Sequence, residues 1–170
     1  MRRLFAVPVG ALALALVTAL QATEALHRVR VDPCAILVVY LAFRADVLGA
    51  AVSTLLLGAL MDVAAGSTLG LHMFSLTLLF VGARIGANAF PWQPGVRLWP
   101  LGVGGAFAHA VLVAALVRVF AEHEFSLAAL WTAALPSLAA DALVSPLLLA
   151  LADALARRVD PEPDHMFLPR

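Results

Sequence analysis

Long apolar runs separated by short polar segments dominate this chain. A helix needs roughly 20 residues to cross the hydrocarbon core of a bilayer, and four runs reach that length: residues 4–22, 47–65, 98–120 and 127–152. A fifth run, residues 69–90, is interrupted only by Arg84 near its end. The pattern predicts an all-α integral membrane protein.

A sixth apolar run, residues 33–43, is short. At about 1.5 Å per residue, a helix of this length covers only about half of the bilayer core. Its start is nevertheless clearly marked, because Asp32 can cap a helix and Pro33 suits the first helical position. Either this run forms a thin sixth span that turns at residues 44–46, or it joins residues 47–65 in one long helix.

The distribution of arginines favours the six-span layout, because basic residues concentrate on the cytoplasmic side of a membrane. Six spans with both termini inside leave only Arg28, Arg30 and Arg118 outside. Five spans give the same tally but place the leading Met1-Arg-Arg outside. A joined helix would also bury Arg44 and Asp46 in mid-span, at a cost of a few kcal/mol each. We therefore expect six transmembrane helices, with five as the alternative.

Composition agrees with a membrane location. Hydrophobic residues make up 63% of the 170, charged residues 13%, and mean hydropathy is +0.97. A soluble domain of this size needs more polar surface. With a net charge of zero, a nucleic-acid partner has no electrostatic support. We expect one polytopic domain over residues 1–156, with an uncleaved first helix, and a short, disordered cytoplasmic tail over residues 157–170.

The segment from Gly58 to His72 predicts a helical hairpin. Asp62 lies near the end of one apolar run, and glycines at 66 and 70 precede the next. Asp62 could accept hydrogen bonds from backbone amides of the turn, meet an arginine of a partner, or simply end a helix at the wet interface. His72 faces it across the turn, but no third ligand accompanies the two, so no metal site is expected.

Two further ionisable residues lie inside predicted spans, where each needs a reason. His109 is at the centre of the fifth span and Asp141 near the centre of the sixth, and these two helices should pack antiparallel. They could form a proton-linked or ligand-binding pair, or an interhelical hydrogen bond that only fixes packing. We find no nucleophile–base arrangement, phosphate-binding loop or cysteine cluster, and Cys34 is the single cysteine. No enzyme activity, cofactor or disulfide is expected.

Small residues follow one helix face in two places, residues 82–86 and 102–108. Such faces allow helix backbones to approach closely. The contact could be internal or with another membrane protein, and internal packing is the commoner outcome.

The order of features from Pro33 to Gly86 resembles the MreD family, the rod shape-determining inner-membrane proteins of bacteria. The features are a proline that opens a short apolar helix, a basic turn at Arg44, and then a set of glycines around one acid: Gly49, Gly58, Asp62, Gly66 and Gly70. Near the C-terminus, residues 139–148 look like the last helix of that family, with Pro146 before a leucine-rich end. One departure is Cys34, where the family usually has Asp, and Asp32 could take its place.

The resemblance implies a non-enzymatic role in the elongation machinery. MreD-like proteins act with MreC, the actin-like MreB, the glycosyltransferase RodA and its penicillin-binding transpeptidase, and they help to direct lateral peptidoglycan synthesis. Their fold is similar to the six-helix substrate-binding component of energy-coupling-factor transporters. That similarity supplies an alternative function, the binding of a vitamin-type small molecule for transport.

Overall fold

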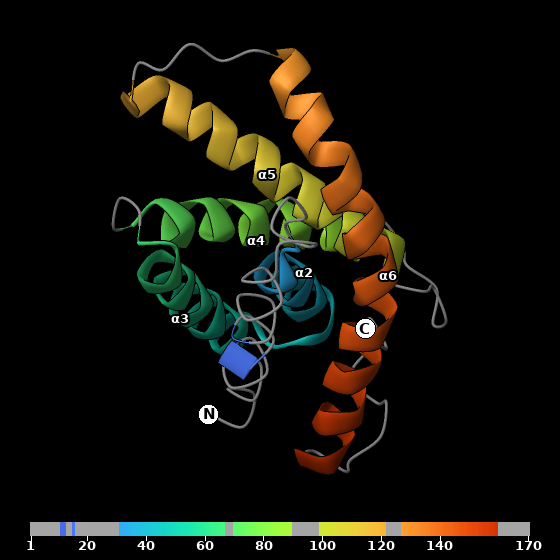
Figure 1. The fold of residues 1–170 in the computed structure, drawn as a ribbon. Coiled ribbons are helices and arrows are strands. Elements are labelled where there is room, and N and C mark those ends of the chain that lie inside the picture. The colour runs from blue at the N-terminus through green and yellow to red at the C-terminus, as the bar shows by residue number, and fades with distance from the viewer. Residues whose placement is uncertain are drawn as a thin grey trace.

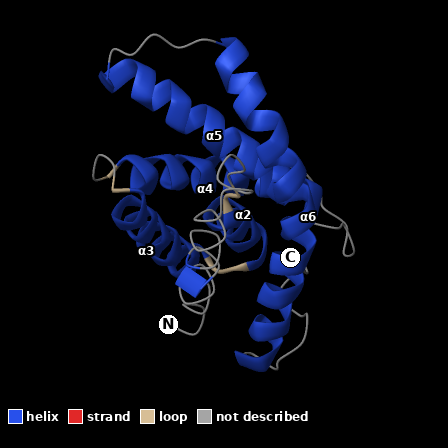
Figure 2. Ribbon diagram, in the orientation of Figure 1, coloured by secondary structure: helices blue, strands red, loops and turns tan. Residues whose placement is uncertain are grey.

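The computed structural model describes residues 11–12, 15, 31–66, 70–89, 99–121 and 127–159. Over these ranges the chain is helical without strands, as predicted (Figure 2). The helices are α2 (Pro33–Arg44), α3 (Val47–Ala65), α4 (Leu71–Ala89), α5 (Trp99–Ala121) and α6 (Leu127–Val159). The predicted first span, residues 4–22, lies almost entirely outside the described residues, as does the tail beyond residue 159.

Three of the described helices are long and apolar enough to cross a membrane. The qualifying stretches are Val47–Ala65 in α3, Trp99–Val119 in α5 and Leu135–Ala156 in α6. Helix α4 has 19 residues, but His72, Arg84 and Asn88 lower its hydropathy and it is not one of the three. The span expected at residues 69–90 is therefore supported by length and not by hydropathy.

The short helix α2 forms the centre of the molecule. All of its residues from 33 to 42 are buried, and it contacts α3, α4, α5 and α6. Figure 1 shows α2 in the middle with the other four described helices around it. An apolar helix that is buried on every side is typical of a core element, so α2 owes its stability to the surrounding helices and not to its own length.

The helix is interrupted between α2, which ends at Arg44, and α3, which begins at Val47. The layout in which the two form one long helix is therefore wrong. The Asp46 side chain caps α3 by accepting from the Gly49 amide at 2.8 Å. At the end of α2, the Arg84 guanidinium of α4 donates to the carbonyl oxygens of Ala42, at 2.7 Å, and Ala45, at 3.1 Å. These are carbonyls that a helix end leaves without intrahelical partners, so Arg84 stabilises the break from the neighbouring helix.

Glycines allow close approach at three helix contacts. A Cβ on Gly58 of α3 would collide with the backbone of Met73 in α4. On α5, a Cβ on Gly105 would collide with the Val39 side chain, and one on Gly102 would lie 2.7 Å from Ser145 Oγ. The small face at residues 102–108 therefore packs internally. Gly82 and Gly86 of the other small face meet nothing within 4 Å.

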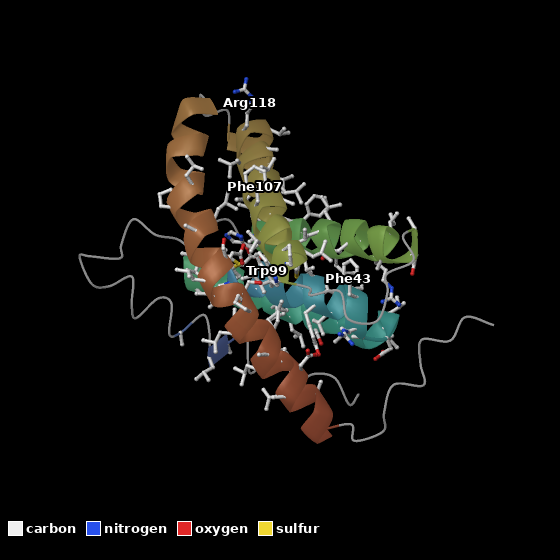
Figure 3. All side chains as sticks on the ribbon, turned by 90° about the vertical axis from the view of Figure 1, so that its right-hand side faces the viewer. Phe43, Trp99, Phe107 and Arg118 are labelled. Atoms are coloured by element: carbon white, nitrogen blue, oxygen red, sulfur yellow. The ribbon has the colours of Figure 1, made fainter. Side chains whose placement is uncertain are left out.

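Helices α5 and α6 pack against each other as predicted. Trp99 begins α5 near α2 and α6, and Arg118 lies at the opposite end of α5 (Figure 3). Helix α6 contains two interior prolines, Pro136 and Pro146. It continues to Val159, so it includes the first three residues of the predicted tail.

Candidate functional site

Asp32 connects the start of α2 to the middle of α5. Its Oδ1 accepts from the Ala35 amide at 2.9 Å, which is the helix cap predicted from the sequence, with Pro33 in the first turn. Its Oδ2 meets Nδ1 of His109. Only 2% of the His109 side chain and 16% of the Asp32 side chain are exposed. The cap residue is thus also the partner of a buried imidazole.

The other nitrogen of the His109 ring meets Ser75 of α4. Nε2 of His109 and Oγ of Ser75 are 2.9 Å apart, and the serine is fully buried. The same hydroxyl lies 3.1 Å from the backbone carbonyl of His72 and can donate to it. Asp32, His109 and Ser75 therefore form one continuous buried polar chain that links α2, α5 and α4.

Asp141 of α6 meets this buried polar chain at Asp32. Its Oδ1 accepts from the Asp32 backbone amide at 3.0 Å, and the residue is 4% exposed. The sequence predicted either a functional pair of His109 and Asp141 or a hydrogen bond between their helices, and the structure brings both residues to Asp32. No contact between them is described, so the expected direct pair becomes an arrangement in which Asp32 holds both residues.

Asp62 closes the hairpin between α3 and α4. Its carboxylate accepts from three backbone amides: Gly70 at 2.9 Å, His72 at 2.8 Å and Met73 at 3.2 Å. This is the first of the roles predicted for it. Gly66 and Gly70 both adopt positive φ, 58° and 95°, which glycine allows without steric cost. Asp62 itself is 3% exposed, so it does not end α3 in solvent.

His72 joins Asp62 to the buried polar chain. Its amide binds Asp62, its carbonyl accepts from Ser75, and its ring lies against that of His109, with centroids 5.7 Å apart and planes tilted by 51°. The ring atom Nδ1 is buried and has no hydrogen-bond partner among the described residues. The predicted site residues Asp62, His72, His109 and Asp141 are therefore neighbours, although they come from four helices.

Two predicted residues, Pro33 and Pro146, and the single cysteine Cys34 lie away from this cluster or at its edge. Pro33 is buried at the start of α2, directly after Asp32. Pro146 is exposed on α6, next to Ser145, whose hydroxyl donates to the Trp99 carbonyl at 3.2 Å. Cys34 is fully buried in α2. Asp32 was predicted as a helix cap but not as a partner of His109, and Ser75 was not predicted at all.

The sequence contains no local signal for the missed contacts. Asp32 and His109 are 77 residues apart, and Ser75 and His109 are 34 apart. A serine within an apolar helix more often donates to its own backbone. The contacts of His109 with Asp32 and Ser75 depend on the tertiary packing of α2, α4 and α5.

The order carboxylate, imidazole and hydroxyl is also that of serine hydrolases. Here the hydroxyl of Ser75 is fully buried and also contacts the His72 carbonyl. A nucleophile needs access to a substrate carbonyl, and this conformation offers none. Over the described ranges, no group of His, Cys, Asp or Glu side chains is placed to hold a metal ion.

Comparisons with models of protein families, with curated proteins and with solved structures find no match to this chain.

Proposed function

We propose that this chain is a non-enzymatic membrane subunit, or scaffold, of the bacterial rod elongation complex. In this role it helps to control cell shape and lateral peptidoglycan synthesis. It lies in the inner membrane with six spans and both termini in the cytoplasm, and its fold is similar to that of the substrate-binding component of energy-coupling-factor transporters. Its partners are an MreC-like membrane protein and, directly or through it, MreB, RodA and the penicillin-binding transpeptidase.

The observation that carries the proposal is the unit formed by α2, α3 and α4. The residues on which the resemblance rests are the ones that build this unit: Pro33 opens α2, Gly58 admits the backbone of α4, and Asp62 closes the hairpin. Gly66 and Gly70 supply the backbone angles of the turn. A set of glycines in an apolar sequence can arise by chance, but separate structural roles within one unit of three helices support a shared architecture.

The alternative is a component that binds a vitamin-type small molecule for a transporter. Such a component needs polar side chains that are free to line a cavity. In the described structure Asp32, His109 and Ser75 bond to one another, which favours a structural role for them. The unpartnered Nδ1 of His72 is the observation that favours the alternative.

The test is to isolate the full-length tagged chain from its own host in mild detergent and to identify what accompanies it. Recovery of an MreC-like single-span protein supports the scaffold. Recovery of an ATPase-containing transporter module in its place overturns the proposal and favours the alternative. Depletion in a rod-shaped host should round the cells, and unchanged shape with unchanged wall growth also contradicts it.

A further inference from the structure

Helix α2 is buried on every side. Its residues from 34 to 42 are each at most 3% exposed. Successive side chains of a helix point in directions about 100° apart, so a run of this length samples the whole circumference of α2. Protein therefore covers α2 all round, and the helices that provide this cover can be identified from their contacts.

The described helices form a ring around α2 that is open on one side. Helices α3, α4, α5 and α6 all contact α2, and each of them packs against the next one in this order. The last and the first of the four, α6 and α3, share at most a marginal contact. The strip of α2 between α3 and α6 therefore needs a further cover, because it is as deeply buried as the rest of the helix.

Residues 11–12, which belong to the first apolar run of the chain, lie at this opening. They are helical. In Figure 1 they are the blue piece between α3 and α6, below α2, and the side view in Figure 3 also shows them below α2. Ala11 is partly buried, whereas Leu12 is 70% exposed. This piece of helix therefore has one side toward the molecule and one side away from it.

From these observations we propose that the surface of α2 between α3 and α6 is a docking site for residues 4–22 of the same chain, which close the ring as a helix. The run contains no charged residue and has as many residues as α3, beside which it would lie. The α2 surface that it would cover is apolar, and burying apolar surfaces against each other is favourable. The inference does not depend on the proposed function.

The proposal also predicts which side of this helix faces α2. Since Leu12 points outward, and since each residue turns a helix by about 100°, the side chains of Leu14 and Val17 lie roughly on the opposite side. Leu14 should therefore contact α2, α3 or α6, whereas Leu12 should contact lipid. The two leucines are close together in one apolar run, so they form a matched pair for an experiment.

The test places a photoreactive diazirine amino acid at position 14 or at position 12 of the full-length protein. Membranes of the expressing cells are irradiated, and the cross-linked peptides are identified by mass spectrometry. We expect the probe at position 14 to attach to α2, α3 or α6 of the same chain, and the probe at position 12 to attach to lipid.

The other outcomes of this experiment contradict the proposal. Attachment of the position 14 probe to a second copy or to another protein, seen as a band of higher mass, would mean that a different occupant covers α2. Attachment to α4, to α5 or only to lipid would place residues 4–22 elsewhere, and equal protein cross-linking from both positions would remove the predicted orientation. If the position 14 variant does not accumulate, a probe at Val17 on the same side gives the same comparison.

Discussion

At the scale of single residues, Asp62 is important because its carboxylate accepts hydrogen bonds from three backbone amides. The first turn of a helix leaves amides without intrahelical partners, and one carboxylate here serves three amides at the start of α4. A negative charge at a helix N-terminus is also favourable. Near lipid, no water replaces a lost acceptor. The hydrogen bonds that Asp62 accepts at this position should therefore contribute more to stability and assembly than its negative charge.

We predict that Asp62→Ala weakens assembly with partner proteins more than Glu122→Ala or Glu124→Ala does. Each buried amide that loses its acceptor costs about 1–3 kcal/mol, so the purified variant should also unfold at a lower temperature. Assembly is measured by pull-down at matched expression levels, since an unfolded variant would mimic lost binding. Asp62→Asn, which retains one side-chain acceptor oxygen, should lie between wild type and Asp62→Ala. Normal accumulation and normal pull-down of Asp62→Ala would contradict this prediction, because the three hydrogen bonds would then contribute nothing to assembly.

At the scale of elements, the contact between α3 and α4 depends on the absence of a side chain. The backbone of Met73 occupies the space that a Cβ of Gly58 would need. The obstacle is backbone and not the flexible end of a side chain, so neither helix can yield without moving as a whole. Close backbone approach at small residues is a common way for membrane helices to associate.

We predict that Gly58→Ala lowers the free energy of unfolding by about 1–3 kcal/mol, as overpacking of a tight contact does. The control is Gly82→Ala on α4, where a Cβ meets nothing within 4 Å. That substitution should be neutral or stabilise slightly, since Ala favours helix by up to about 1 kcal/mol over Gly. Thermal unfolding of both variants in the same detergent gives the comparison. If the two variants unfold at the same temperature, the close approach of α3 and α4 is wrong.

At the scale of the whole molecule, the layout proposed for the membrane rests on where the arginines lie. Arg118 lies at the far end of α5 from Trp99 (Figure 3). Arg84 of α4 contacts the C-terminal end of α2, where Arg44 lies, through its hydrogen bonds to the Ala42 and Ala45 carbonyls. Under the proposed layout Arg44 and Arg84 are cytoplasmic and Arg118 is periplasmic, in keeping with the preference of arginine for the cytoplasmic side.

We predict that residues 44–46 are cytoplasmic and Glu122 periplasmic. Single cysteines are introduced and labelled with a membrane-impermeant maleimide in intact and in permeabilised cells. Ala45 is only 8% exposed, so Arg44→Cys, at an exposed position, reports better on that turn. The natural Cys34 is fully buried and should give little background. Glu122→Cys should react in intact cells and Arg44→Cys only after permeabilisation, and the reverse pattern would refute the layout.

Much of the fold could be read from periodicity and local chemistry. The helix start at Pro33 follows from Asp32, whose predicted capping role the structure confirms, whereas the cap that Asp46 provides for α3 was not predicted. The hairpin turn follows from Gly66 and Gly70, because few other residues adopt the backbone angles it needs. These features depend on residues close together in sequence, so the chain alone determines them.

The sequence by itself determined that the protein is helical, apolar and suited to a membrane, and it determined which polar residues require a partner. Only the tertiary structure decided which partners they have. His109 meets Asp32 and Ser75 and not Asp141, because α2 is short and its N-terminal cap reaches the middle of α5. Nothing in a one-dimensional pattern fixes the depth at which a short helix sits among longer ones. That depth results from packing, since Gly102 and Gly105 of α5 leave room for the side chains of Ile36 and Val39 of α2.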